Sequence, residues 1–364
     1  MVPFLDLRAA YETKRSAISA ALLRVAESGS YLLGAELAAF ESEFARFCVA
    51  AHCVGVANGL DALRLALLAL GVEPGDEVVV PSNTYIATWL AVSQCGARVV
   101  PVEPVEETFN IDADRLEAAI SVRTKVILPV HLYGQPADMD GVLASASRHG
   151  VRVLDDCAQA HGARYKGRPV GALADVSAWS FYPGKNLGAF GDAGAVTGND
   201  RALLDQVRLL GNYGSRVKYH NLVKGFNSRL DEVQAAVLQV KLEGLSEATN
   251  RRRAIAARYL EGLKDLPLRL PHVPSFAEPA WHLFVVRHAD RDGLQRRLQE
   301  RGIGTLIHYP IAPHLQPAYQ ELGLRRGQLP ISERLHAEVL SLPIWPEMGD
   351  AAVEEVVDAV RRCA

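Results

Sequence analysis

Short apolar runs alternate with longer segments of mixed polarity through the first two thirds of the chain. The runs are largely apolar, with isolated polar residues, and show no strict alternation between apolar and polar positions, which is typical of strands covered by helices on both faces. Strands separated by helical segments in this way favour a mainly parallel sheet, with any ligand bound at the carboxyl ends of its strands. The runs predict strands at residues 54–56, 77–80, 97–102, 125–130, 151–154 and 176–181.

The last third of the chain has a different pattern. Residues 230–263 carry apolar side chains at helical spacing, and a proline-rich passage at 267–279 separates them from another apolar run at 283–286. Such a passage is typical of an entry into a second domain. We therefore predict a large domain of residues 1–245, whose N-terminal helix can pack on the other domain, and a smaller C-terminal α/β domain of residues 246–364.

One lysine, Lys185, lies in a glycine-rich turn between two apolar strands, in the segment Ser-Phe-Tyr-Pro-Gly-Lys-Asn-Leu-Gly at residues 180–188. A lysine that forms a Schiff base has to lose its proton near neutral pH, so it needs a confined site. The alternative is a solvated surface lysine. Lys166, in a polar turn, is a rival candidate that we expect to be exposed.

The predicted strand at 151–154 ends in Asp155 and Asp156, and Gln159 follows three residues later. Pyridoxal phosphate needs a carboxylate beside its pyridine nitrogen, because the protonated ring acts as an electron sink. Asp156 is a candidate for that carboxylate, and Gln159 for a donor to the ring's phenolate oxygen. Both aspartates are equally compatible with caps of the turn after the strand.

Two further corners between strand and helix fit the same cofactor. Asn58 and Gly59 precede an apolar helix, whose first backbone amides would bind a phosphate, and Ser180 offers a hydroxyl to it. A plain turn is the alternative, since no Walker or dinucleotide glycine pattern is present. Tyr85 lies at the second corner, where it would stack on a flat ring or pack in the core.

Composition excludes several other classes of protein. The 364 residues are 49% hydrophobic, enough for a large core in two domains, and the net charge of −3 gives no basic excess for nucleic acid. The five cysteines include no Cys-x-x-Cys pair, so we expect neither a disulfide framework nor a metal site. No basic flank precedes an apolar run at the N-terminus, and no apolar stretch is long enough to span a membrane. We therefore expect a cytoplasmic protein that binds no membrane.

Ordered motifs along nearly the whole chain resemble the DegT/DnrJ/EryC1/StrS sugar aminotransferases. That family consists of pyridoxal-phosphate enzymes with the aspartate-aminotransferase fold, fold type I, which has a mainly parallel central sheet, helices on both faces and a smaller C-terminal α/β domain. The motifs lie at residues 3–7, 28–34, 58–59, 130–140, 180–188, 226–232, 307–310 and 340–343.

The resemblance implies a role for each candidate residue. Lys185 would hold the cofactor's aldehyde and, once released, act as base and acid, while Asp156 would contact the pyridine nitrogen and Gln159 the ring hydroxyl. Asn227 would reach the phosphate in the neighbouring subunit, which implies a homodimer with shared sites. The remaining cofactor contacts would be Tyr85 on the ring, and Gly59, Leu60 or Asp61 with Ser180 on the phosphate.

The substrate is suggested by the loop at residues 212–221, which resembles that of relatives acting on the 3-keto group of dTDP-linked 6-deoxyhexoses. Arg216 and Lys218 would bind the diphosphate while a tyrosine packs on the base or sugar, although a solvated basic loop is the alternative. His308 and Tyr309 would line the sugar pocket, although a core histidine fits equally well. The other substrate candidates are Tyr31, Tyr182, Tyr219 and His220.

The predicted reaction is transfer of an amino group from L-glutamate to a dTDP-3-keto-6-deoxyhexose. Three alternatives remain: a C4-aminotransferase of a dTDP- or UDP-4-keto-hexose, a sugar dehydratase that uses the same cofactor, and a non-catalytic sugar-nucleotide binding protein. Three residues depart from the family pattern: Tyr213 replaces a frequent histidine, Cys157 a usual alanine, and Ala193 a frequent glycine. Tyr213 bears on sugar recognition, whereas none of the three removes a catalytic group.

Overall fold

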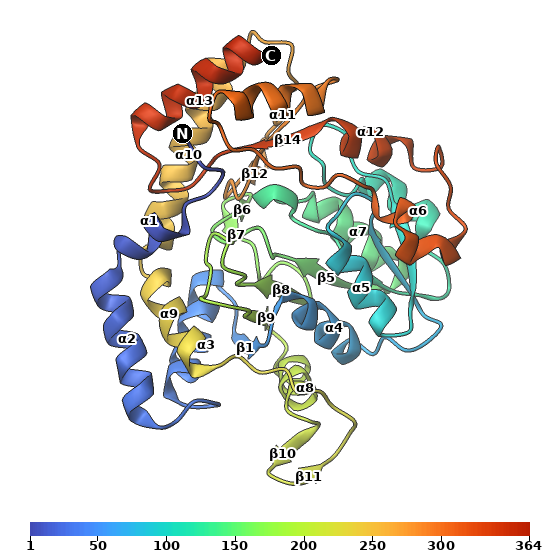
Figure 1. The fold of residues 1–364 in the computed structure, drawn as a ribbon. Helices are drawn as coiled ribbons and strands as arrows, with labels where there is room; N and C mark the ends of the chain where they lie inside the picture. The colour runs from blue at the N-terminus through green and yellow to red at the C-terminus, as the bar shows by residue number, and fades with distance from the viewer.

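The computed structural model describes residues 1–364, with a seven-stranded sheet at its centre (Figure 1). All neighbouring strands are parallel except in the two pairs formed by β9, which runs antiparallel to β1 and β8. The mainly parallel sheet predicted from the apolar runs is therefore confirmed. In sheet order the strands are β1 (His52–Val56), β9 (Gly194–Gly198), β8 (Val176–Ser180), β5 (Arg152–Asp156), β4 (Thr124–Ile127), β2 (Glu77–Pro81) and β3 (Arg98–Val102).

Helices cover both faces of this sheet. In β2, Val78 and Val80 pack with α4, α5 and α8, whereas Val79 points to the other face and packs with α7. Successive side chains of a strand point to opposite faces, and helices cover both faces, so both sets are buried; this explains why the strands are largely apolar without alternation. The covering helices are α4 (Gly59–Ala69), α5 (Ile86–Gln94) and α8 (Arg201–Gly211) on one face, and α3 (Ala35–Cys48), α7 (Met139–His149) and α9 (Glu232–Leu242) on the other.

A separate apolar core lies in the C-terminal part of the chain. Val2 joins this core and forms a bridge with Ile303, so the first residues of the chain pack beside the last ones (Figure 1). The boundary at residue 245, where α10 begins, stays a prediction. The elements of this part are α10 (Leu245–Leu263), α11 (Arg291–Glu300), α12 (Pro330–Glu338), α13 (Asp350–Cys363) and the antiparallel pair β13 (Phe284–Arg287) and β14 (Val339–Leu342).

Two of the sequence motifs meet at the start of α3. Glu232, at the start of α9 and buried, accepts the backbone N–H groups of Gly34, Glu36 and Leu37 at 2.8, 2.9 and 3.1 Å. The start of α3 has no cap from its own side chains, so Glu232 satisfies amides that would otherwise be unpaired. The motifs at 28–34 and 226–232 therefore have a shared structural role.

The remaining elements are short or peripheral. No helix has both the length and the apolar character needed to cross a membrane. The hairpin of β10 and β11 projects from the body of the molecule (Figure 1). These elements are α1 (Leu7–Glu12), α2 (Arg15–Ser28), α6 (Leu116–Ala119), β6 (Arg164–Tyr165), β7 (Arg168–Pro169), β10 (Ser215–Val217), β11 (His220–Asn221) and β12 (Ala277–Glu278).

Candidate active site

A cleft of about 880 Å³ lies at the carboxyl ends of β5 and β8. Its walls come from the N-terminal segment, the start of α4, the corner before α5, and the segment at 306–309. The cleft therefore lies where a mainly parallel sheet binds its ligand. The predicted site residues that line it are Gly59, Leu60, Tyr85, Asp156, Gln159, Ser180, Tyr182, Lys185, His308 and Tyr309.

Lys185 lies in the turn that follows β8, and its backbone N–H donates to the Tyr182 carbonyl at 2.8 Å. Gly188 closes this turn, because a Cβ at that position would lie 2.3 Å from the Pro183 carbonyl oxygen. Burial lowers the pKa of Lys185 from 10.5 to about 8, and attraction by Asp156 opposes that change. Lys185 therefore loses its proton much more readily than a solvated lysine.

Asp156 ends β5 and is only 6% exposed. Burial raises the pKa of this carboxyl, while the Ala158 N–H on Oδ1 and the Thr88 hydroxyl on Oδ2, both at 3.0 Å, act in the opposite direction. Thr84 lies 3.0 Å from the Thr88 hydroxyl. Since the single proton of Thr88 goes to Asp156, Thr84 donates to Thr88. The carboxylate is thus fixed by two donors.

The start of α4 leaves backbone N–H groups open at the cleft. Asn58 caps the helix by accepting the Asp61 N–H at 2.8 Å, whereas the N–H groups of Gly59 and Leu60 have no acceptor in the chain. Ser180 lies against this start, so closely that a Cβ on Gly59 would be 2.5 Å from the Ser180 Cβ. Free N–H groups at a helix start form an anion site. Asp61 does not line the cleft, and its carboxylate pairs with Arg64 at 2.8 Å.

Tyr85, Tyr309 and Gln159 form a connected polar and aromatic wall. The rings of Tyr85 and Tyr309 are 4.9 Å apart, and the Gln159 Nε2 donates to the Tyr309 hydroxyl at 3.0 Å. The Gln159 Oε1 accepts the Tyr133 N–H at 2.6 Å, which fixes the orientation of the amide. The second amide hydrogen of Gln159 remains available for the cleft.

Sequence reasoning missed several residues that line the cleft, among them Thr88 and His282. The His282 Nδ1 lies 3.3 Å from the Asn186 Oδ1, and the Asn186 Nδ2 donates to the Ala280 carbonyl at 3.0 Å. The Asn186 oxygen therefore accepts, Nδ1 carries the proton, and Nε2 keeps a lone pair. Burial lowers the pKa of His282 well below 6.5, so the ring is neutral. Thr84 and Thr88 are four residues apart, a spacing that can bring two side chains together at a helix start, so the sequence held a signal for Thr88. No sequence pattern marks His282 as a residue of the cleft.

The other predicted residues do not line the cleft of their own chain. Tyr31 and Tyr219 are 54% and 85% exposed, and Asn227 is exposed as well. The loop residues Arg216, Lys218, Tyr219 and His220 belong to the projecting β10–β11 hairpin and are all exposed.

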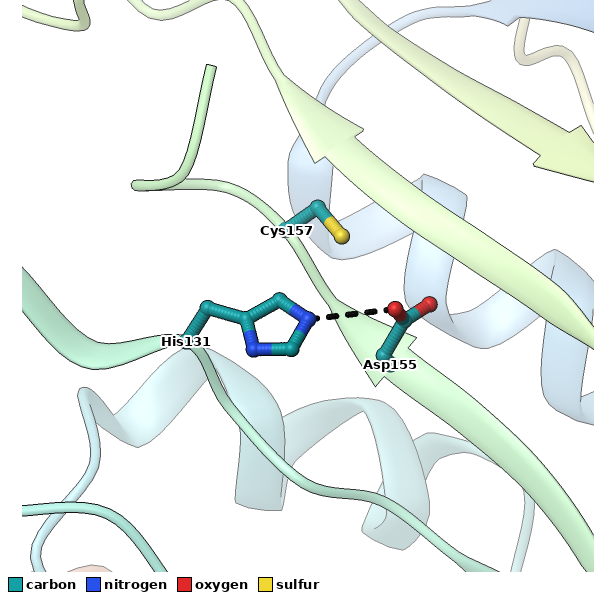
Figure 2. Close-up of side chains that lie close together, drawn as sticks. All are labelled: His131, Asp155 and Cys157. Carbon is teal, nitrogen blue, oxygen red and sulfur yellow. Dashed lines mark hydrogen bonds and ion pairs between the residues drawn. The ribbon is translucent and has the colours of Figure 1, made fainter. Parts of the chain in front are cut away.

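Asp155 points away from the cleft into a buried cluster with His131 and Cys157 (Figure 2). The Ala137 N–H donates to the His131 Nδ1 at 3.0 Å, so Nε2 carries the ring proton and donates to Asp155 at 3.1 Å. A protonated Nε2 cannot bind a metal ion. The cluster therefore acts as a hydrogen-bonded anchor for the turn after β4, and only Asp156 serves the cleft.

A desolvated lysine and a buried aspartate at the end of a mainly parallel sheet, beside a helix start with open N–H groups, are typical of proteins that carry out carbonyl and amine chemistry. The family within that class is shown by the sequence. The chain belongs to the DegT/DnrJ/EryC1/StrS aminotransferase family, whose model matches residues 12–361.

Individual relatives match over almost the full length. The chain is 55% identical to the dTDP-3-amino-3,4,6-trideoxy-alpha-D-glucose transaminase of Streptomyces venezuelae, covering 100% of this chain and 96% of the relative. The crystal structure of DesV from S. venezuelae in complex with a ketimine intermediate superposes with a TM-score of 0.98 at 55% identity, covering 99% and 98% of the two chains. The structure of NtdA from Bacillus subtilis with bound cofactor PMP superposes with a TM-score of 0.92 at 32% identity. The match covers 100% of this chain and 85% of the NtdA chain.

Proposed function

We propose that this protein is a pyridoxal-phosphate-dependent aminotransferase that transfers an amino group from L-glutamate to the 3-keto group of a dTDP-3-keto-6-deoxyhexose. The observation that carries the proposal is the pairing of Lys185, whose pKa is lowered to about 8, with the buried Asp156 in one cleft. The C3 position is supported by the 55% identity to a transaminase named for a 3-amino sugar.

The residues of the cleft fit each functional group of the cofactor. Asp156 suits a protonated ring nitrogen, Gln159 the phenolic oxygen, and Lys185 the aldehyde. The open N–H groups of Gly59 and Leu60 suit the phosphate, together with the neighbouring Ser180 hydroxyl. The volume of about 880 Å³ leaves space for a sugar substrate beside the cofactor. When bound, pyridoxal phosphate supplies the electron sink for the amino transfer.

Each side chain of the site then has a defined task. With a pKa of about 8, the Nζ of Lys185 both accepts and gives up a proton near neutral pH. Asp156, fixed by Ala158 and Thr88, would accept a hydrogen bond from the protonated ring nitrogen of the bound cofactor. The neutral Nε2 of His282 accepts only, so it favours a hydroxyl group over a carboxylate.

A homodimer accounts for the predicted residues that lie outside the cleft. Asn227 and the β10–β11 hairpin, with Arg216 and Lys218, would complete the partner's site with contacts to the phosphate and the diphosphate. Large apolar side chains are exposed near these segments, including Leu32 at 47% and Leu222 at 65%, as expected for a surface that a second copy covers. The proposed partner is therefore a second copy of this chain.

Subunit mixing tests the shared site. Lys185→Ala and Arg216→Glu are each expected to be inactive, and a mixture that exchanges subunits regains activity because some dimers contain one intact site. Mixtures that remain inactive despite subunit exchange would refute a site shared between subunits.

The visible absorption of the purified protein tests the reaction. We expect the band of the cofactor bound to Lys185 to disappear with L-glutamate and to return with the dTDP-3-keto sugar but not with its 4-keto isomer. If the band returned only with the 4-keto isomer, the mechanism would stand and the position of amino transfer would be C4. Ammonia release without amino transfer would indicate a dehydratase, and failure to hold pyridoxal phosphate would indicate a binding protein. The matched control is Lys166→Arg, which should keep the band that Lys185→Arg loses.

A further inference from the structure

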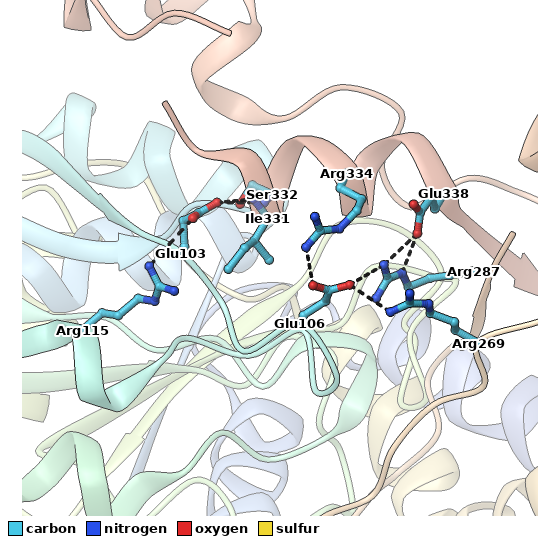
Figure 3. Close-up of polar contacts among 9 residues, drawn as sticks. All are labelled: Glu103, Glu106, Arg115, Arg269, Arg287, Ile331, Ser332, Arg334 and Glu338. Carbon is cyan, nitrogen blue, oxygen red and sulfur yellow. Dashed lines mark hydrogen bonds and ion pairs between the residues drawn. The ribbon is translucent and has the colours of Figure 1, made fainter. Parts of the chain in front are cut away.

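The loop after β3 carries two acidic residues that bind the C-terminal part of the chain (Figure 3). Glu103 is 7% exposed, and its Oε1 accepts the N–H groups of Ile331 at 2.6 Å and Ser332 at 3.0 Å. Both groups belong to the first turn of α12, where no helix carbonyl is available, and Pro330 before them has no N–H. No side chain of the α12 segment caps this end, so Glu103 acts as its cap from the loop after β3.

Glu106 strengthens the same contact through a network of ion pairs (Figure 3). It lies 2.7 Å from Arg287 of β13 and 3.2 Å from Arg269, and it also pairs with Arg334 of α12. Arg287 is 4% exposed and also pairs with Glu338 at 2.7 Å. Because Arg287 is buried, its pairs are screened less by solvent than those at a surface. The network fixes α12 against the loop at a second point.

The other end of α12 contacts the segment at 306–309 that lines the cleft. The Nδ1 of His336 lies 2.6 Å from the carbonyl oxygen of Tyr309. Because a carbonyl oxygen only accepts hydrogen bonds, Nδ1 carries a proton and donates. The His308 Nδ1 lies 2.9 Å from the Ser341 hydroxyl in the strand that follows α12. Tyr309 in turn receives the Gln159 amide at 3.0 Å. A continuous set of contacts therefore runs from Glu103 through α12 to the wall formed by His308 and Tyr309.

We propose that Glu103 is a positioning residue that, by capping α12, holds the Tyr309 hydroxyl against Gln159 for binding of the sugar substrate. The effect on the sugar rests on the proposed function, whereas the mechanical link from Glu103 to Tyr309 does not. If Glu103 only stabilised α12, its replacement would leave the cleft wall at residues 306–309 unchanged. The two cases therefore differ in what happens at residues 306–309.

Hydrogen–deuterium exchange of the cofactor-loaded protein tests the mechanical link. Glu103→Ala is expected to raise exchange in peptides covering 305–312 about tenfold, the equivalent of ~1.4 kcal/mol. Glu103→Gln keeps an oxygen acceptor and should restore most of the protection. The matched control is Asp290→Ala, which removes the cap of α11, where the Asp290 Oδ1 accepts the Gly293 N–H at 3.1 Å. That variant should raise exchange in α11 alone. If Glu103→Ala fails to fold, Glu103→Asp, whose shorter side chain withdraws from α12, serves instead.

A double-mutant cycle with Tyr309→Phe tests the consequence for the substrate. Glu103→Ala should raise the KM for the keto sugar about tenfold, and this effect should vanish in the Tyr309→Phe background, because no hydroxyl remains to be misplaced. Two results would overturn the role of Glu103. One is that Glu103→Ala and Tyr309→Phe have additive effects on the KM. The other is that Glu103→Ala raises exchange at 305–312 no more than Asp290→Ala does. A wild-type protein that converts no keto sugar would overturn the proposed function, and the exchange data would still decide the link.

Discussion

Replacing Lys185 by methionine should stabilise the cofactor-free protein at neutral pH, because it removes a charge that the cleft solvates poorly. A pKa lowered from 10.5 to about 8 corresponds to roughly 3 kcal/mol of penalty for the charged form, at 1.36 kcal/mol per pKa unit. Since Lys185 keeps part of its surface exposed, solvent screening reduces the expected gain to about 1–2 kcal/mol. Methionine has a similar length and no charge, so the packing changes little.

The gain should depend on pH in a defined direction. The folded protein binds the Lys185 proton less tightly than the unfolded chain does, so the wild type is penalised in full below about pH 8. The penalty shrinks as the pH rises from about 8 to 10.5, because the lysine then becomes neutral in both states. The advantage of Lys185→Met should therefore disappear over this window.

Urea denaturation of the cofactor-free proteins at about pH 7 and about pH 10.5 measures the difference in free energy of unfolding. Lys166→Met is the matched control, because Lys166 is exposed and pairs with Asp140 at 2.5 Å, which raises its pKa. That variant should show no gain at either pH. A Lys185→Met protein that is no more stable than the wild type at neutral pH would refute the reasoning, and an equal gain at both pH values would point to packing instead of desolvation.

Three further substitutions test other contacts of the structure. Thr88→Val removes a charge-assisted hydrogen bond to Asp156 that is worth about 1.5–3 kcal/mol. It should therefore weaken pyridoxal phosphate binding roughly 10–100-fold in equilibrium dialysis. Thr88→Ser keeps the hydroxyl and should restore the affinity. Glu232→Ala leaves three N–H groups at the start of α3 unpaired. It should lower the free energy of unfolding, measured by urea titration, by about 2–4 kcal/mol. A change below about 0.5 kcal/mol would contradict the capping role. Gly59→Ala places a Cβ 2.5 Å from the Ser180 Cβ, so it should weaken binding of the cofactor, and unchanged affinity in the same dialysis would argue against a phosphate site there.

Features that depend on neighbouring residues in the sequence were predictable. The largely apolar runs predicted the mainly parallel sheet, because strands buried on both faces need apolar side chains on both of them. The positions of Lys185 and Asp156 at the cleft were predictable because Asp156 ends one strand and Lys185 lies in the turn after another, and strand ends meet at one edge of a parallel sheet. The same argument found Gly59 and Tyr85. The family resemblance, read from ordered motifs, was confirmed by the match over residues 12–361.

Contacts between distant segments were decided only by the tertiary structure. The sequence left Asp155 and Asp156 equivalent, and the alternation of side chains along β5 directs one to His131 and the other to the cleft. The bond from Gln159 to Tyr309 joins positions 150 residues apart. The Glu103 cap of α12 likewise depends on how two separate parts of the chain pack. Local sequence determined the strands and the chemistry at their ends, whereas hydrogen-bond geometry between remote side chains depends on packing distances that no local pattern contains.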